Sequence, residues 1–269
     1  MVHQIIHVII NMKYWASKVI KPYIQDFGYK SICEIGASDG KATDKICGLS
    51  NIHISIIDPC FDVDLVKKYK HKNNITVYNG LSLEILPTMA KEFDCFLIDG
   101  DHNWYTVYHE LTTIHERNLL TDGGTIFFHD VGWPYAKRDM YYQPDSIPKE
   151  YRHPFSTNGM IYGQSMLSPT DGRGRGLCNA EHEGGPKNAV LRAIEDFLDE
   201  RRNDYFLFRF TDECGLGVLV KRSGLKSRSR LVKWFLVSRF WNVFAIPKTI
   251  IYRKFPSLYG FIKKLLLAQ

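Results

Sequence analysis

Five short apolar runs recur between residues 31 and 130, and each one ends in a polar turn. Segments with helical spacing separate the runs. The runs are Ser31–Gly36, His53–Asp58, Ile75–Gly80, Phe93–Asp99 and Thr125–Asp130. Strands that alternate with helices at this spacing predict βαβ units and a parallel sheet.

The flanks of this region add helices and a hairpin. A helix is predicted over residues 13–27, with Pro22 kinking or dividing it. Further on, the pattern predicts a helix over Pro186–Arg202, followed by strands at Tyr205–Phe210 and Gly215–Val220. The predicted fold is therefore α/β, a mostly parallel sheet of seven strands with a C-terminal antiparallel hairpin.

Residues 131–186 interrupt the regular pattern and are rich in Gly, Pro, Tyr and Arg. Long irregular segments inside compact domains are usually lids or binding loops, or else disordered. The aromatic residues Trp133, Tyr135, Tyr141 and Tyr142 follow the fifth run. Their rings suit the apolar faces of sugars, or they could equally pack the segment itself.

Charge is divided unevenly along the chain. The net charge is +6, yet residues 221–269 hold 12 Lys and Arg and no Asp or Glu, which leaves residues 1–220 acidic. In this tail Leu231–Phe244 has the spacing of an amphipathic helix, and Pro247 and Pro256 are expected to interrupt the residues beyond it. Such a helix fits a membrane surface or a lipid-linked substrate, or it could pack on the domain or on a second subunit.

Composition narrows the class of protein. With 269 residues, 45% hydrophobic and 24% charged, the chain suits one large α/β domain, or one domain plus an appendage. The six cysteines form no CxxC pair, which is typical of buried free thiols in a reducing compartment. The first ten residues lack the features of a signal peptide, and no run is long enough to span a bilayer. We therefore expect a cytoplasmic protein, with membrane association through the tail as an open alternative.

Polar residues collect where the first two runs end. The segment Glu34–Gly40 has the spacing ExGxxxG, and its small residues would let a ligand approach the backbone amides that open the next helix. Asp58 ends the second run, where a carboxylate can accept hydrogen bonds from both ribose hydroxyls of a nucleoside. Together these features favour a nucleoside-containing ligand over two ordinary turns.

These residues resemble the first motif and the ribose-binding acid of the class I S-adenosylmethionine-dependent methyltransferases, whose fold is Rossmann-like. Gly80-Leu81-Ser82 resembles the segment that contacts adenine in that family. The resemblance covers about Ser31–Arg222 and implies that S-adenosylmethionine (SAM) is the cofactor. The residues it implies for cofactor binding are Glu34, Gly36, Ser38, Asp39, Gly40, Asp58, Ser82 and Asp99.

Two further segments resemble a narrower group. Ile98–Leu111 and Leu119–Asp130 are similar to the metal-dependent O-methyltransferases that include the macrolide-sugar methyltransferases. The resemblance implies a metal site at Asp99, His129 and Asp130, with His102 as the catalytic base. An imidazole has an ordinary pKa that allows it to take a proton near neutral pH.

His129 departs from that group, whose sugar-methylating members carry an acidic residue there. Carboxylates suit Mg²⁺, whereas an imidazole is a softer ligand that Mn²⁺ tolerates better. The expected ion is therefore Mg²⁺ or Mn²⁺.

The resulting expectation is a metal-assisted O-methyltransferase that acts on a sugar, glycan or glycolipid hydroxyl. The alternatives are methylation of a small phenolic or polyketide acceptor, and a non-catalytic SAM-binding membrane adaptor. Nucleic acid is not an expected partner because the body of the chain is acidic, and a homo-oligomer is left open. The expected division is an N-terminal helical segment (residues 1–30), a methyltransferase domain (31–222) with a substrate-covering insertion (131–186), and a basic tail (223–269).

Overall fold

A computed structural model describes residues 12–60, 63–212, 214–225 and 227–254, and it describes side chains as far as residue 243. Pro256 and the first eleven residues lie outside the described part of the chain. Among the described residues, no helix is both long and apolar enough to cross a membrane.

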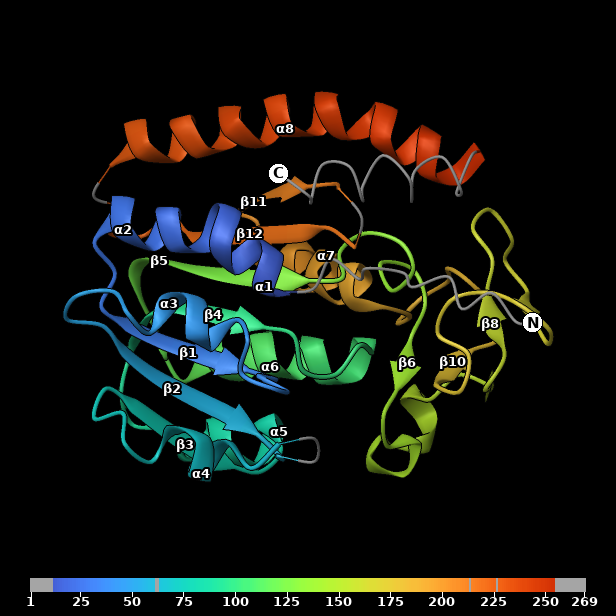
Figure 1. Ribbon diagram of the computed structural model, residues 1–269, viewed down its shortest axis with the longest axis horizontal. Helices are drawn as coiled ribbons and strands as arrows, with labels where there is room; N and C mark the ends of the chain where they lie inside the picture. Colours follow the sequence, from blue (N-terminus) through green and yellow to red (C-terminus); the bar gives the residue numbers. More distant parts are fainter. Residues whose placement is uncertain (1–11, 61–62, 213, 226, 255–269) are drawn as a thin grey trace.

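A seven-stranded sheet in the order β11-β12-β5-β4-β1-β2-β3 forms the centre of the molecule (Figure 1). Strands β1 to β5 pair in parallel, and β12 is antiparallel to both of its neighbours, β5 and β11. This confirms the predicted Rossmann-like sheet with its C-terminal hairpin. The strands are β1 (Ser31–Ile35), β2 (His53–Asp58), β3 (Ile75–Asn79), β4 (Phe93–Ile98), β5 (Leu120–His129), β11 (Tyr205–Phe210) and β12 (Leu216–Lys221).

Helices cover both faces of the sheet and create two apolar cores. The N-terminal helices, α3, α4 and α8 contribute to one core, while η2, α6 and α7 contribute to the other. Neighbouring residues of β5, such as Phe127 and Phe128, belong to opposite cores because side chains alternate along a strand. The helices are α1 (Met12–Trp15), η1 (Ala16–Ile20), α2 (Lys21–Phe27), α3 (Thr43–Ile46), α4 (Leu65–Tyr69), α5 (Ser82–Ile85), η2 (Leu86–Thr88), α6 (Trp104–Glu116), α7 (Val190–Glu200) and α8 (Arg228–Lys254).

Several predicted boundaries shift for local reasons. The π-helical turn η1 ends two residues before Pro22, which lacks the backbone amide that a regular helix needs. Helix α7 begins at Val190 instead of Pro186, and Ala189 before it has a φ of 100°. Strand β5 begins five residues earlier than predicted, because Leu120 pairs with Phe93 ahead of an irregularity in the ladder.

The insertion has more regular structure than its sequence predicts, although each piece is short. Two small sheets form there, one of three strands and one of two. Their strands are β6 (Met140–Tyr141), β7 (Phe155–Ser156), β8 (Gly159–Met160), β9 (Leu167–Ser168) and β10 (Cys178–Ala180), and the 3-10 turns are η3 (Pro144–Ser146) and η4 (Lys149–Tyr151).

Helix α8 lies across the outside of the sheet and packs on β11 and α2 (Figure 1). The expected interruption at Pro247 is wrong, since the helix continues to Lys254. A proline removes one backbone hydrogen bond, and here the flanking residues keep their helical conformation.

The order of the strands reverses between β1 and β4, and their ends approach closely there. A Cβ atom on Gly36 would lie 2.3 Å from the Cα atom of Gly100. The φ of Gly36 is also positive, at 79°. Both conditions require glycine, and they allow two strand-to-helix turns to meet at the switch point where ligands bind in open α/β sheets.

We expect Gly36→Ala to destabilise the fold by about 2–4 kcal/mol, because it combines a left-handed backbone with a steric overlap. Gly28→Ala is the matched control, since Gly28 has a similar φ of 72° but nothing within 4 Å of the added atom. The control should lose only about 1 kcal/mol. Urea unfolding measures both losses, and equal losses would show that the close approach to Gly100 has no energetic weight.

Candidate active site

The turn after β1 is held by the end of β2. The Asp58 carboxylate accepts hydrogen bonds from the backbone amides of Ser38 (2.9 Å) and Cys60 (2.6 Å). The amide of Gly36 donates to the carbonyl oxygen of Ile57 (3.0 Å). The structure therefore brings Gly36, Ser38 and Asp58 together, as a shared nucleoside site requires.

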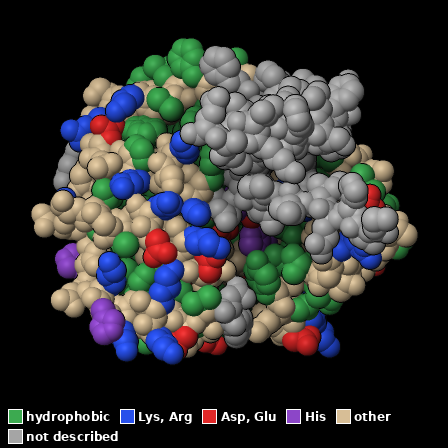
Figure 2. Space-filling view, in the orientation of Figure 1, with side chains coloured by type: hydrophobic (Ala, Val, Ile, Leu, Met, Phe, Trp, Pro, Cys, Tyr) green, Lys and Arg blue, Asp and Glu red, His purple; other side chains and the backbone are tan. Residues whose placement is uncertain are grey.

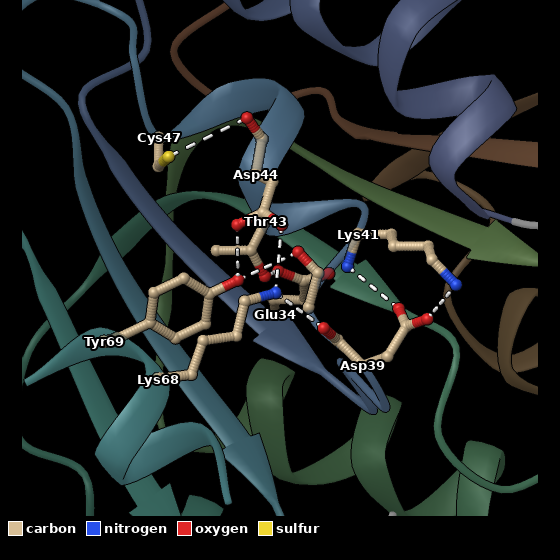
Figure 3. Close-up of polar contacts among 9 residues, drawn as sticks. Glu34, Asp39, Lys41, Thr43, Asp44, Cys47, Lys68 and Tyr69 are labelled. Atoms are coloured by element: carbon tan, nitrogen blue, oxygen red, sulfur yellow. Dashed lines mark hydrogen bonds and ion pairs between the residues drawn. The ribbon is translucent and has the colours of Figure 1, made fainter. Parts of the chain in front are cut away.

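Two side chains of α4, Lys68 and Tyr69, also hold the turn after β1 in place (Figure 3). The Tyr69 hydroxyl lies 2.8 Å from the Gly40 carbonyl oxygen and 2.9 Å from Asp44 Oδ1. Lys68 Nζ donates to the carbonyl oxygen of Asp39 (2.6 Å) and to Asp44 Oδ2 (2.9 Å). Any Cβ on Gly40 would overlap the Tyr69 hydroxyl, so this turn fits only a glycine.

Two buried glutamates belong to this region, namely Glu34, which was predicted to bind the cofactor, and Glu110, which was not. Glu34 accepts a hydrogen bond from Thr43 (Figure 3), and burial raises the pKa of Glu34 to about 7. Glu110 on α6 accepts a hydrogen bond from Ser82 Oγ (2.5 Å), and burial raises the pKa of Glu110 to about 8. The second oxygen of Glu110 has no hydrogen-bond partner among the described residues. Ser82 is thus fixed by a side chain that the sequence-based prediction missed.

Two carboxylates and two imidazoles meet at the ends of β4 and β5. His129 Nδ1 lies 3.0 Å from both Asp99 Oδ1 and Asp130 Oδ2. His102 Nε2 lies 2.6 Å from Asp130 Oδ2 and 3.6 Å from Asp99 Oδ1. Asp130 has a φ of 58°, a left-handed conformation that directs the chain sharply out of β5.

The cluster shifts the pKa of each of its members. Burial opposes the charged form of His102, but the charge of Asp130 and the hydrogen bonds to both carboxylates outweigh burial and raise its pKa to about 10. The pKa of His129 is raised well above its usual value by the same two carboxylates, again against burial. Burial would raise the pKa of Asp99 and of Asp130, yet the charge of His129 and the imidazole hydrogen bonds lower both.

These four side chains could hold a divalent cation. Each offers one ligand atom, and the four atoms lie within 4.8 Å of one another. The donor set mixes carboxylate oxygen with imidazole nitrogen, which suits Mn²⁺ better than Mg²⁺. The three ligands expected from the sequence therefore fit a metal site of the predicted kind, and His102, the expected base, lies beside them.

The insertion is tied directly to the turn that carries His102. The amide of Met140 donates to the carbonyl oxygen of His102 (3.0 Å). The neighbouring Asp139 carboxylate accepts hydrogen bonds from the amides of Trp104 (2.7 Å) and Ala189 (2.6 Å) and from the Tyr141 hydroxyl (2.9 Å). One buried carboxylate thus joins the insertion to the starts of α6 and α7. Burial raises the pKa of Asp139 to about 6, although these hydrogen bonds act in the opposite direction.

The aromatic residues of the insertion play different parts. Tyr141 is buried, and its hydroxyl is bonded to Asp139, so it packs the insertion. Tyr135 is also buried, with its ring 5.1 Å from that of His102. Tyr142 is 57% exposed, and its ring lies 5.7 Å from that of His102. Tyr142 is therefore the exposed aromatic surface beside the cluster.

Sequence reasoning found the cluster but missed two residues that support it. Glu110 follows Val107 by three residues and precedes Leu111 and Ile114, so helical spacing places it on the buried face of α6. A buried carboxylate on an apolar helix face is a detectable signal. Asp139 has no comparable signal, because two of its three partners are backbone amides far along the chain.

Comparison with known proteins agrees with this topology. Residues 33–131 match the family model described as a methyltransferase domain. Searching the curated proteins gives no significant match.

Solved structures of similar fold include three methyltransferases. The SAH-bound methyltransferase PaMTH1 of Podospora anserina is 15% identical over 78% of this chain and 77% of its own, with a TM-score of 0.49. The O-methyltransferase TomG of Streptomyces achromogenes, in complex with SAM, is 13% identical over 78% of each chain, with a TM-score of 0.48. A Bacillus cereus O-methyltransferase in complex with SAH is 14% identical over 78% of this chain and 80% of its own, with a TM-score of 0.46.

Likenesses this weak carry no substrate over to this chain. Independently of these solved structures, the family match agrees with the strand order and with the turn after β1. Residues 33–131 match the methyltransferase domain model, and the strand order of the sheet is consistent with the class I fold.

Proposed function

We propose that this protein transfers a methyl group from SAM to a sugar or glycan hydroxyl, with assistance from a divalent metal ion. One observation carries the proposal: Asp99, His102, His129 and Asp130 converge at the carboxyl ends of β4 and β5. These ends adjoin the switch point between β1 and β4, where the cofactor of an open α/β sheet binds.

The cofactor would lie along the turns that follow β1, β2 and β3. Amides at Glu34–Gly40 suit its carboxylate, and Asp58 suits its ribose hydroxyls. Ser82, held by Glu110, would border the adenine. Asp99, which follows β4, would lie between the methyl donor and the other metal-binding residues.

The reaction moves one methyl group and one proton. The acceptor oxygen forms a bond to the methyl carbon while the bond from carbon to sulfur breaks, so that the sulfonium becomes a neutral thioether. The hydroxyl proton passes to a base. A divalent cation at this site would orient the acceptor hydroxyl and lower its pKa. The protein mainly positions the two reactants in line.

His102 suits the role of base through Nε2, the ring nitrogen that faces the two carboxylates. It can accept a proton only when it is neutral, and the two carboxylates oppose that state by raising its pKa to about 10. A divalent ion held by the carboxylates would lower the pKa of His102 and so favour its neutral form. We therefore expect His102 to act as a base only when the ion is bound.

The exposed ring of Tyr142 favours an acceptor with a flat apolar surface. A pyranose ring presents such a face, and so does a phenol or an aromatic polyketide. The second candidate function is therefore methylation of a small phenolic or polyketide hydroxyl at the same site.

Binding of Mn²⁺ should release protons and should tighten as pH rises from about 6 to about 8, because His129 must lose its proton before it can ligate and a protonated His102 would repel the ion. The pKa of His102 is raised to about 10 and that of His129 well above its usual value, so protons compete with the ion throughout this range. Calorimetry in two buffers of different ionisation heat measures the protons released. Asp99→Asn should abolish binding, whereas Asp145→Asn, at an exposed aspartate, should not. Binding that is independent of pH would exclude His129 as a ligand.

His102→Ala should lower methyl transfer by about 10²–10⁴-fold, the usual contribution of a general base, while SAM binds with unchanged affinity. The matched control is His71→Ala, at an exposed histidine outside the site, and it should retain full activity. Rates are measured with labelled methyl donor in the presence of Mn²⁺. Full activity of His102→Ala would remove His102 from the mechanism.

Tyr142→Ala should raise the KM for the acceptor by about fivefold or more with little change in SAM affinity, because it removes a stacking surface. Met166→Ala is the control, since Met166 is equally exposed, at 57%, and lies in the same insertion. The acceptor is chosen by assaying glycans, glycolipids and phenols in parallel. Activity on phenols alone would favour the second candidate, and an unchanged KM would show that Tyr142 does not touch the acceptor.

A further inference from the structure

The outward face of α8 carries an unbroken apolar stripe. Val232, Leu236, Phe240 and Val243 are 54%, 48%, 67% and 61% exposed. Their spacing of four, four and three residues places them in one line along an α-helix. Four of the ten exposed large apolar side chains in the described part of the chain therefore lie on a single helix face.

Contacts on the opposite face fix the direction of this stripe. Trp234 is buried, and its Nε1 atom donates to Asp26 on α2 (2.8 Å). Asn242 accepts a hydrogen bond from the amide of Thr211 (2.8 Å) and donates to the carbonyl oxygen of Arg209 (2.8 Å). These contacts hold α8 against the sheet at both ends of the stripe, so that the stripe must face outward.

Basic side chains border the stripe on both sides. With 3.6 residues per turn, Lys233 and Arg239 lie about 60° to either side of Leu236. Both are exposed, as are Arg228 and Arg230 in the first turn of α8. At the upper left of Figure 2, hydrophobic and basic side chains lie next to one another. No acidic residue occurs anywhere in residues 221–269.

We propose that α8 docks this protein on the surface of an anionic lipid bilayer. The apolar stripe would enter the boundary between headgroups and acyl chains, and the two rows of cations would meet lipid phosphates. The proposal concerns a surface apart from the methyl-transfer site, and it does not depend on the identity of the acceptor.

Charge favours a bilayer over a second copy of the chain. Two copies that paired through this stripe would bring Lys233 and Arg239 of one copy against the same cations of the other. Lys233 already has a carboxylate beside it, since its Nζ atom lies 2.9 Å from Asp26 Oδ2 on α2. Like charges in contact still oppose such a pairing, because no carboxylate on α8 relieves the remaining cations. Anionic headgroups neutralise both rows at once.

Vesicle sedimentation of the full chain tests the proposal. Wild-type protein should bind vesicles of phosphatidylcholine with phosphatidylglycerol and should bind phosphatidylcholine alone far more weakly. Phe240→Glu should reduce binding to the anionic vesicles by more than about tenfold, because it removes buried apolar area and adds a negative charge. Arg239→Gln should reduce it by about fivefold, as expected for one interfacial cation.

Val66→Glu is the matched control, because Val66 is an exposed apolar residue, at 49%, on the distant helix α4. It makes the same kind of change and should bind as the wild type does. Thermal unfolding should be the same for all variants, since each changed side chain is exposed.

Three results would each overturn the proposal. One is equal binding of wild-type protein to neutral and anionic vesicles, and another is equal binding by Phe240→Glu and Val66→Glu. The third is a wild-type dimer by light scattering that Phe240→Glu dissociates, without vesicle binding, which would assign the stripe to a second copy of this chain.

Discussion

Two carboxylates at the ends of adjacent strands lie so close together that both stay ionised only with positive charge between them. Asp99 and Asp130 both lie 3.0 Å from one imidazole nitrogen of His129. Burial makes the repulsion between them costly, and it makes any cation between them correspondingly effective. The two carboxylates therefore need positive charge beside them. In the metal-free site the protons on His102 and His129 supply it, and in a metal-bound site a divalent ion could supply it.

This need for positive charge explains why His129 is compatible with a metal site, although the similar sugar-methylating enzymes carry an acidic residue at this position. An acid at this position would add a third negative charge, whereas an imidazole can carry a proton or offer a lone pair. Because His129 binds a metal ion only in its neutral form, metal affinity would depend on pH. Whether His102 is neutral, and so able to act as a base, would depend on whether the metal ion is bound. The histidine therefore changes how the site is charged while leaving its position in the fold unchanged.

The sequence predicted those features that depend on local pattern. All seven strands of the sheet follow from apolar runs. Asp58 was identified at the end of such a run, whereas Asp99 and Asp130 were identified through the resemblance to the metal-dependent O-methyltransferases. Features that depend on distant partners could not be predicted in the same way. Asp139 matters through amides at Trp104 and Ala189, and the start of α7 depends on that contact instead of on Pro186. The continuation of α8 through Pro247 likewise runs against the local preference of proline.

The place of β12 has a consequence for the order in which the chain can assemble. This strand comes last in the sequence among the seven, yet it lies between β5 and β11 and not at the rim of the sheet. During synthesis, β5 therefore presents an unpaired edge until residue 221 has left the ribosome, and β11 has no neighbour to join before then. An open strand edge is a template for association with other chains. This strand order therefore leaves the edge of β5 open to association with other chains until β12 pairs with it. Helix α8 packs on β11, and it follows β12 in the sequence, so it can cover the sheet only after that step.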